Sequence, residues 1–135
     1  MKPRINIITL AVDNVSKALL FYRDTLGLPT GGMADGADHV AFELQHNLSL
    51  VLYPRTEIAR LVNEPVQTKS SLEFILTYIT EDKAEVDVLL KKVEQAGGSV
   101  LGAPHEHEWG YVGYFKDPDG HLWELIWNPD FETGL

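Results

Sequence analysis

A predicted hairpin near the C-terminus constrains this chain more than any other stretch. Within Trp109–Pro129, two runs rich in Tyr, Phe, Trp and Val flank the sequence Asp117-Pro118-Asp119-Gly120. Such a pattern predicts two antiparallel strands joined by a tight turn. Pro at the second turn position presets φ, and Asp first with Gly last suits a type I turn. The region is therefore expected to be the centre of a β-sheet.

Alternation along the strands divides this hairpin into two faces. A four-residue loop would pair Lys116 with His121 and Gly113 with Glu124, and alternation then assigns every other side chain. The first face carries Tyr111, Gly113, Phe115, Leu122, Glu124 and Ile126. The second face, which we expect a helix to cover, carries Val112, Tyr114, Trp123, Leu125 and Trp127.

Glu124 is the candidate functional residue, because it lies in the middle of an apolar strand. A carboxylate buried without a partner is costly, and a Gly113 opposite it would leave space for a ligand. One interpretation is a pocket with a single acid in its wall. The other is a solvated Glu at the rim of the sheet, with Gly113 marking a bulge.

Composition limits the classes of partner. A chain of 135 residues is one domain, or two small halves that share a core. The formal net charge of −9 argues against a nucleic-acid partner and against an anionic membrane surface. The absence of cysteine excludes disulfides, thiolate metal sites and a Cys nucleophile. No run reaches transmembrane length, and Met1–Arg4 leads directly into a predicted strand without a secretory apolar region, so we expect a cytoplasmic protein.

The remaining periodicity predicts two copies of a β-α-β-β-β module. The first copy has strands at Ile5–Val12, His39–Gln45 and Leu48–Tyr53, a short strand within Leu28–Asp38, and a helix at Val15–Leu26 that ends at Gly27. The second has a strand at Leu72–Thr80, a helix from the cap Asp82 to Gly97, a short strand within Ser99–Glu108, and the hairpin. Each helix carries one apolar stripe, which would pack on its own sheet.

These modules predict an α+β fold of curved mixed sheets around a central groove. We expect a single domain, 1–135, with module one at 4–54, a linker at 55–70 containing one helical turn, and module two at 71–129. Ile5–Val12 is expected to be buried on both faces. Neither half would bury enough surface alone, so the halves should pair within one chain or between chains, and we expect a homodimer.

Two segments resemble the vicinal oxygen chelate superfamily, which contains glyoxalases, bleomycin-resistance proteins and extradiol dioxygenases. The first is Ile8–Asn14 leading into Phe21–Leu28 (FYRDTLGL), and the second is Gly110–Pro129, which contains DPDGHLWEL. The greatest similarity is to the glyoxalase/bleomycin-resistance-like branch. The resemblance implies paired β-α-β-β-β modules, usually in a homodimer, with the ligand site inside the curved sheets.

The resemblance also implies where a metal would bind. Metal-dependent members carry one ligand on the first strand and one on the last strand of each module. These positions fall on Ile7, Leu50, either Phe74 or Ile75, and Glu124. A divalent metal needs three or more N or O donors, which this set does not supply. We therefore expect neither the superfamily's metal nor another cofactor.

The histidines offer a weaker metal hypothesis. His105 and His107 share one face of a predicted strand, a spacing that can chelate a metal but that also suits a polar edge strand, which we favour. His39, His46 and His121 lie beside turns or strand ends and are expected to be solvated.

An aromatic wall with one acid is typical of a site for an uncharged or cationic, partly planar molecule. We expect an aromatic or apolar ligand in the groove between the modules, with Glu124 orienting or protonating it. The predicted lining is Ile7, Leu50, Trp109, Tyr111, Gly113, Phe115, Leu122 and Ile126. Two alternatives stay open: a lyase or isomerase of the lactoylglutathione lyase type, or a dioxygenase, with Glu124 as general acid/base or metal ligand; and a regulatory dimer whose groove is filled.

Overall fold

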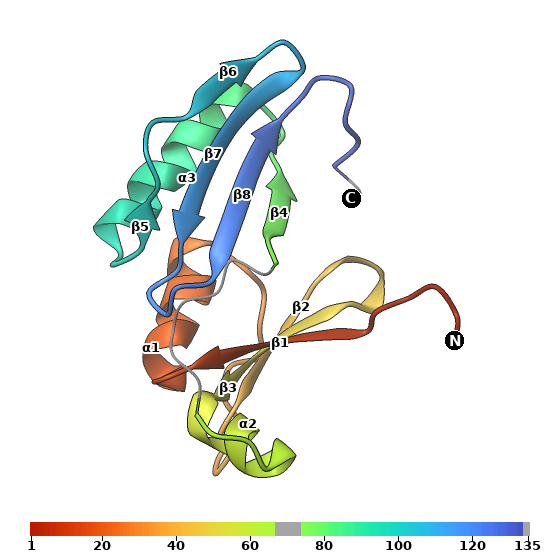
Figure 1. The fold of residues 1–135 in the computed structure, drawn as a ribbon, viewed down its shortest axis with the longest axis vertical. Helices are drawn as coiled ribbons and strands as arrows, with labels where there is room; N and C mark the ends of the chain where they lie inside the picture. The colour runs from red at the N-terminus through yellow and green to blue at the C-terminus, as the bar shows by residue number, and fades with distance from the viewer. Residues whose placement is uncertain (67–73, 134–135) are drawn as a thin grey trace. The chain divides into compact units, whose positions relative to one another are not determined.

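The computed structural model describes residues 1–66 and 74–133 and has the predicted α+β architecture, with two mixed sheets (Figure 1). The chain divides into two compact units, Met1–Thr68 and Lys69–Leu135, called unit 1 and unit 2 below. The predicted module boundary at residues 70 and 71 lies outside the described residues. Among the described residues, no helix is long and apolar enough to cross a bilayer.

Unit 1 contains a three-stranded sheet. Its strands are β1 (Ile7–Val12), β2 (Val40–Glu43) and β3 (Ser49–Pro54). Strand β3 is central, parallel to β1 and antiparallel to β2. The short strand predicted within Leu28–Asp38 is reduced to one bridge between Thr30 and Phe42, because this segment turns at two glycines with positive φ.

One side of this sheet packs on a helix. Side chains of β1 alternate, with Leu10 and Val12 buried and Ile7 58% exposed, so burial on both faces was a wrong prediction. Helix α1 (Val15–Leu20) begins at Asn14, whose Oδ1 accepts a hydrogen bond from the Lys17 amide at 2.9 Å. The predicted helix continues to Thr25 as a π-helical turn, η1 (Phe21–Thr25).

The segment predicted as a linker begins with a helix. Helix α2 (Arg55–Val62) makes two turns where the sequence predicted one, and it ends at Asn63 in the left-handed conformation. The Arg55 guanidinium donates to the Ala11 carbonyl at 3.1 Å and to Asp13 Oδ1 at 3.2 Å. These two bonds tie the start of α2 to the end of β1.

Unit 2 contains a five-stranded sheet. Its strands are β4 (Leu76–Ile79), β5 (Ser99–Val100), β6 (His105–His107), β7 (Gly110–Lys116) and β8 (Leu122–Trp127). The order is β4-β8-β7-β5, with β6 also paired to β7, and only β4 is parallel to its neighbour. The first two residues of the predicted strand Leu72–Thr80 lie outside the described residues.

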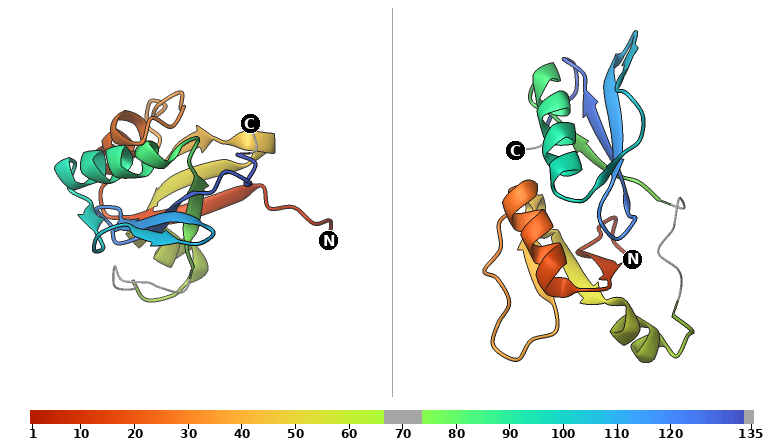
Figure 2. Two further views of the ribbon diagram at one scale, coloured as in Figure 1. Left: turned by 90° about the horizontal axis from the view of Figure 1, so that it is seen from above. Right: turned by 90° about the vertical axis from the view of Figure 1, so that its left-hand side faces the viewer.

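Helix α3 (Lys83–Gln95) lies along one side of the unit 2 strands (Figure 2). It begins at the predicted cap, where Asp82 Oδ1 accepts from the Glu85 amide at 2.9 Å. A Cβ on Gly113 in β7 would lie 2.7 Å from Leu90 Cδ1 of this helix. The glycine therefore permits close packing of α3 on the sheet, and it does not leave space beside Glu124.

The loop between β7 and β8 is one residue shorter than predicted. The Asp117 amide donates to the His121 carbonyl at 3.0 Å, and the Gly120 amide donates to the Asp117 carbonyl at 3.0 Å. Gly120 has a φ of 91°, so the type I turn closes through a left-handed glycine into a three-residue loop. Lys116 consequently pairs with Leu122, and the predicted register was wrong by one residue.

Candidate functional site

The observed register exchanges the two faces of β7 relative to β8. The side under α3 carries Tyr111, Gly113, Phe115, Trp123, Leu125 and Trp127. The opposite side, the uncovered face below, carries Val112, Tyr114, Lys116, Leu122, Glu124 and Ile126. The β8 side chains thus lie as predicted with respect to the helix, whereas those of β7 are reversed.

Glu124 lies half-buried on the uncovered face, between two hydroxyl groups. Tyr114 on β7 donates to Oε2 at 2.7 Å, and Thr77 on β4 donates to Oε1 at 3.0 Å. The hydrogen bond to Glu124 raises the pKa of Tyr114 above its usual value, which favours the neutral phenol as the donor. These three residues are called the Glu124 cluster.

Neither hydrogen-bond partner of Glu124 was predicted from the sequence. Tyr114 was assigned to the other face because the loop was taken to be one residue longer. Thr77 pairs directly with Glu124 through the parallel β4–β8 ladder. No local pattern specifies a pairing between strands this far apart in the chain, so only the alternation of β4 could have indicated that Thr77 faces away from the helix.

Three predicted lining residues lie on the helix side and do not face Glu124. Tyr111 donates to Asp87 Oδ1 of α3 at 2.8 Å, and Lys83 lies 4.8 Å from the centre of its ring. Phe115 is 1% exposed, and Gly113 lies against α3. Their assignment to the Glu124 face was wrong, because it depended on the four-residue loop.

The two predicted positions in unit 1 lie on opposite sides of its sheet. Leu50 is 1% exposed and pairs with Phe42, whose ring contacts Tyr22 of η1, so it belongs to the core and cannot line a groove. Ile7 is on the other side and is exposed. In unit 2, Leu122 and Ile126 share the face of Glu124, as predicted, and both are half-buried.

Trp109 and the two histidines of β6 are exposed at the edge of the unit 2 sheet. The Trp109 ring stacks on His107, with centroids 5.0 Å apart and planes 5° apart. His105 pairs with Val112 and His107 with Gly110, so both project on the uncovered side. Within residues 1–66 and 74–133, no three His, Asp or Glu side chains gather as a metal site.

The donors around Glu124 do not fit the metal of the vicinal oxygen chelate superfamily. In unit 2 its carboxylate is accompanied by two neutral hydroxyl groups, and each carboxylate oxygen already accepts one of them. Phe74 and Ile75, which precede β4, supply no donor atom from their side chains. A divalent ion needs three or more N or O ligands, which this arrangement does not provide.

His121 is largely buried beside the hairpin loop, so its prediction as a solvated residue was wrong. Its side chain is 12% exposed, and Nδ1 lies 2.6 Å from Oδ2 of the fully buried Asp117. Oδ1 of Asp117 accepts from the amides of Asp119 and His121 at 2.9 and 2.8 Å. This pair stabilises the loop and lies away from the uncovered face.

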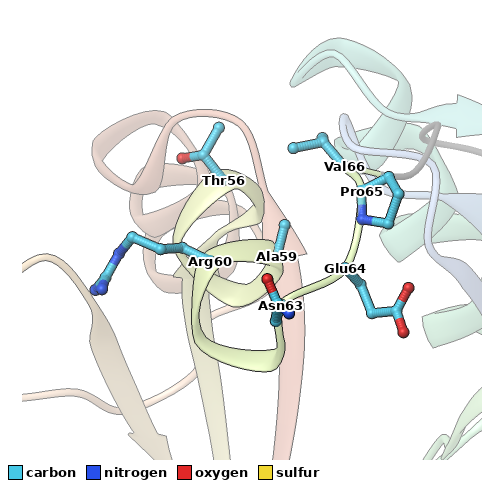
Figure 3. A pocket seen from close by; sticks show the side chains of 7 residues that line it. All are labelled: Thr56, Ala59, Arg60, Asn63, Glu64, Pro65 and Val66. Carbon is cyan, nitrogen blue, oxygen red and sulfur yellow. The ribbon is translucent and has the colours of Figure 1, made fainter.

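A separate hollow of about 600 Å³ lies on α2 and the residues that follow it (Figure 3). It is lined by Thr56, Ala59, Arg60, Asn63, Glu64, Pro65 and Val66. Arg60 is paired with Glu57 through a bond of 2.7 Å and extends away from Pro65 and Val66. None of the predicted site residues lines this hollow.

Comparisons with known proteins agree with the fold. Residues 4–125 match the Glyoxalase/Bleomycin resistance protein/Dioxygenase superfamily, and the chain belongs to this superfamily. The uncharacterized protein YraH of Bacillus subtilis is 28% identical over 123 residues, which are 87% of this chain and 93% of YraH.

Two solved structures extend the comparison. A glyoxalase-related enzyme from Fulvimarina pelagi has a TM-score of 0.84 at 22% identity, over 98% of this chain and 96% of its own. Lactoylglutathione lyase from Agrobacterium tumefaciens has a TM-score of 0.68 at 26% identity, over 98% of this chain and 100% of its own. These similarities confirm the predicted superfamily and fold class.

Proposed function

We propose that the chain binds a small aromatic or apolar organic molecule on the uncovered face of unit 2, with Glu124 as the polar anchor and without a bound metal. The observation that carries this proposal is the fixed carboxylate. Two hydroxyls from neighbouring strands hold Glu124 in one orientation, within hydrogen-bond distance of both of its oxygens. A carboxylate oriented in advance loses little side-chain entropy when a ligand binds.

The neighbours of Glu124 favour an organic ligand. Leu122 and Ile126 precede and follow it on the same side of β8, and both retain exposed surface. Ligand sites commonly combine such apolar surface with a few polar groups that fix orientation. The exposed stack of Trp109 and His107 adds a planar surface at the sheet edge.

An enzyme is the second candidate, and the similarity to lactoylglutathione lyase over nearly the whole of both chains favours it. In that case Glu124 would transfer a proton to or from a bound substrate as a general acid/base. Tyr114 and Thr77 would then orient the carboxylate. Turnover that is lost on Glu124→Gln, in protein without bound metal, would support this candidate over simple binding.

Ligand binding is tested by ¹H–¹⁵N NMR with 2-naphthylmethanol and related aromatic fragments. We expect shifts of the Thr77, Tyr114 and Glu124 amides, which weaken in Glu124→Gln. The control is Glu43→Gln, which removes the same charge from an exposed position on β2. Shifts confined to residues outside unit 2, or absent for every fragment, would contradict the proposal.

The absence of metal is tested by elemental analysis of tag-free protein. We expect less than about one tenth of an equivalent of Zn, Ni, Fe or Mn per chain, because one carboxylate and two hydroxyls are a poor ligand set. A full equivalent that is lost in Glu124→Gln would refute the metal-free site.

We also propose that the protein is a cytoplasmic homodimer. The support is the exposed apolar surface of unit 1, where Ile5 and Ile7 are 64% and 58% exposed. Light scattering coupled to size exclusion should give twice the 15.1 kDa chain mass. A chain mass that persists at micromolar concentration would show that the protein is a monomer.

A further inference from the structure

The Glu124 cluster offers a ligand only hydrogen-bond acceptors. An ionised carboxylate has about four acceptor positions and no proton to donate. The hydroxyl protons of Tyr114 and Thr77 are already directed at Oε2 and Oε1, at 2.7 and 3.0 Å. What remains for a ligand is the free lone pairs of the carboxylate and of the two hydroxyl oxygens.

Hydrogen bonding also keeps the Tyr114 proton in place. The pKa of this phenol is raised first by its bond to Glu124 and then by burial. The phenol therefore stays protonated at neutral pH and continues to donate to the carboxylate. A ligand group that can only accept, such as a carboxylate, would have to displace one of these two bonds.

The net charge of the whole chain also favours a cationic ligand over an anionic one. A formal net charge of −9 attracts cations and repels anions at long range. Lys116 is the one cation among the β7 and β8 residues of the uncovered face, two positions from Tyr114. Its long stem lets the ammonium group extend into solvent, where its repulsion of a bound cation is screened.

We propose that the Glu124 cluster binds the protonated nitrogen of a cationic organic molecule, whose apolar part lies over Leu122 and Ile126. This inference rests on the proposed function, because it names the chemical class of the ligand for that face. An ammonium group donates up to three hydrogen bonds, so it can satisfy the lone pairs that the cluster leaves free.

The test compares three probes that share one ring system and differ in one group: 2-naphthylmethylammonium, 2-naphthylmethanol and 2-naphthoate. Their dissociation constants are measured from the Thr77, Tyr114 and Glu124 amide shifts. We expect the ammonium to bind about tenfold tighter than the alcohol, because a charged donor forms a stronger hydrogen bond to a carboxylate than a neutral hydroxyl does. The naphthoate should bind weakest.

Variants separate this inference from general affinity for the ring. Glu124→Gln should weaken the ammonium about tenfold and change the alcohol by less than about threefold. Lys116→Met should strengthen the ammonium about twofold, because it removes a repelling charge. Glu43→Gln is the matched control, and we expect both affinities to stay within about twofold of wild type because its carboxylate is exposed and its charge is screened by solvent and salt.

The outcomes distinguish the two proposals. Equal or tighter binding of the alcohol or the naphthoate at this face would overturn the cationic class and leave the binding function standing. Binding of the ammonium that Glu124→Gln does not weaken would also overturn it. If no probe shifts any amide of unit 2, the proposed function fails and the inference fails with it.

Discussion

In each unit, one side of the sheet packs on a helix through buried apolar side chains. The two units differ on the other side of the sheet. On the helix side, Leu50 of unit 1 and Leu125 of unit 2 are both almost completely buried. On the uncovered side, unit 1 presents the exposed apolar Ile7, whereas unit 2 presents Glu124 between two hydroxyl donors. The difference shows which side of a repeated module is restricted by packing and which is free to carry chemistry.

Packing explains why the helix sides are alike. A sheet and a helix must exclude water at close-packed density, and few combinations of apolar side chains achieve this. A strand side without a helix has no such requirement, so a single carboxylate can be accommodated there once it is hydrogen-bonded.

Truncation of the helix-side leucines should give the largest effect. We expect Leu50→Ala and Leu125→Ala each to lower the free energy of unfolding by about 2–5 kcal/mol, because each leaves a cavity in a buried core. Urea denaturation followed by circular dichroism measures this change. Ile7→Ala on the uncovered side should cost less than about 1 kcal/mol, since the side chain is largely exposed. If Leu50→Ala cost as little as Ile7→Ala, Leu50 would not be a core residue, and it would again be a candidate lining residue of the ligand site.

The second largest effect is expected for the Asp–His pairs of the two units, which should contribute differently to the free energy of unfolding. Asp117→Asn should lower the free energy of unfolding by about 2–3 kcal/mol, because the buried carboxylate accepts two amides and the His121 ring. Asp38 and His39 of unit 1 form a pair of 3.0 Å that is about half exposed. Asp38→Asn should therefore cost less than about 1 kcal/mol, and equal costs for the two substitutions would contradict the role of burial.

Substitution by alanine distinguishes a glycine that packs against a helix from a glycine with open space beside it. Gly113→Ala should cost about 1–3 kcal/mol, since the new Cβ would lie 2.7 Å from Leu90 Cδ1. Gly31→Ala in unit 1 meets no atom within 4 Å and has an ordinary φ, so it should be neutral or slightly stabilising. Thermal unfolding of the two variants measures the difference. A neutral Gly113→Ala would mean that α3 does not approach β7 this closely.

The smallest effect should come from removal of a tyrosine hydroxyl on the side of each sheet that no helix covers. Tyr114→Phe should lower the free energy of unfolding by about 1 kcal/mol, because a half-exposed carboxylate loses one donor and regains water. It should also shift the Glu124 side-chain carboxyl resonance in ¹³C NMR. Tyr53→Phe in unit 1 is the control, and it should leave that resonance unchanged. An unchanged resonance in Tyr114→Phe would show that the bond to Glu124 does not form.

Local patterns predicted the elements that local interactions determine. The cap at Asp82 and the glycine that ends α3 each depend on residues within one turn of the chain. The superfamily could also be predicted, because the FYRDTLGL and DPDGHLWEL segments are specific.

The candidate site was only partly predictable, because its partners depend on register. Glu124 was identified from its position in an apolar strand. Tyr114 was assigned to the wrong face through a one-residue difference in loop length. Leu50 was placed in the site by the resemblance, and it lies in the core of unit 1. Alternation has a period of two, so an error of one residue exchanges the entire set of side chains.

The length of the three-residue loop at Pro118–Gly120 therefore determines which side chains of β8 face away from α3. If α3 keeps β7 fixed, one residue added to this loop can turn β8 over and direct Trp123 and Leu125 outward in place of Glu124. A lineage that varies the length of such a turn could thus gain or lose a reactive face without changing any residue of the strands. Gly120 helps to keep the loop at three residues. Its left-handed conformation closes the short loop, and a residue with a side chain would be strained at this position.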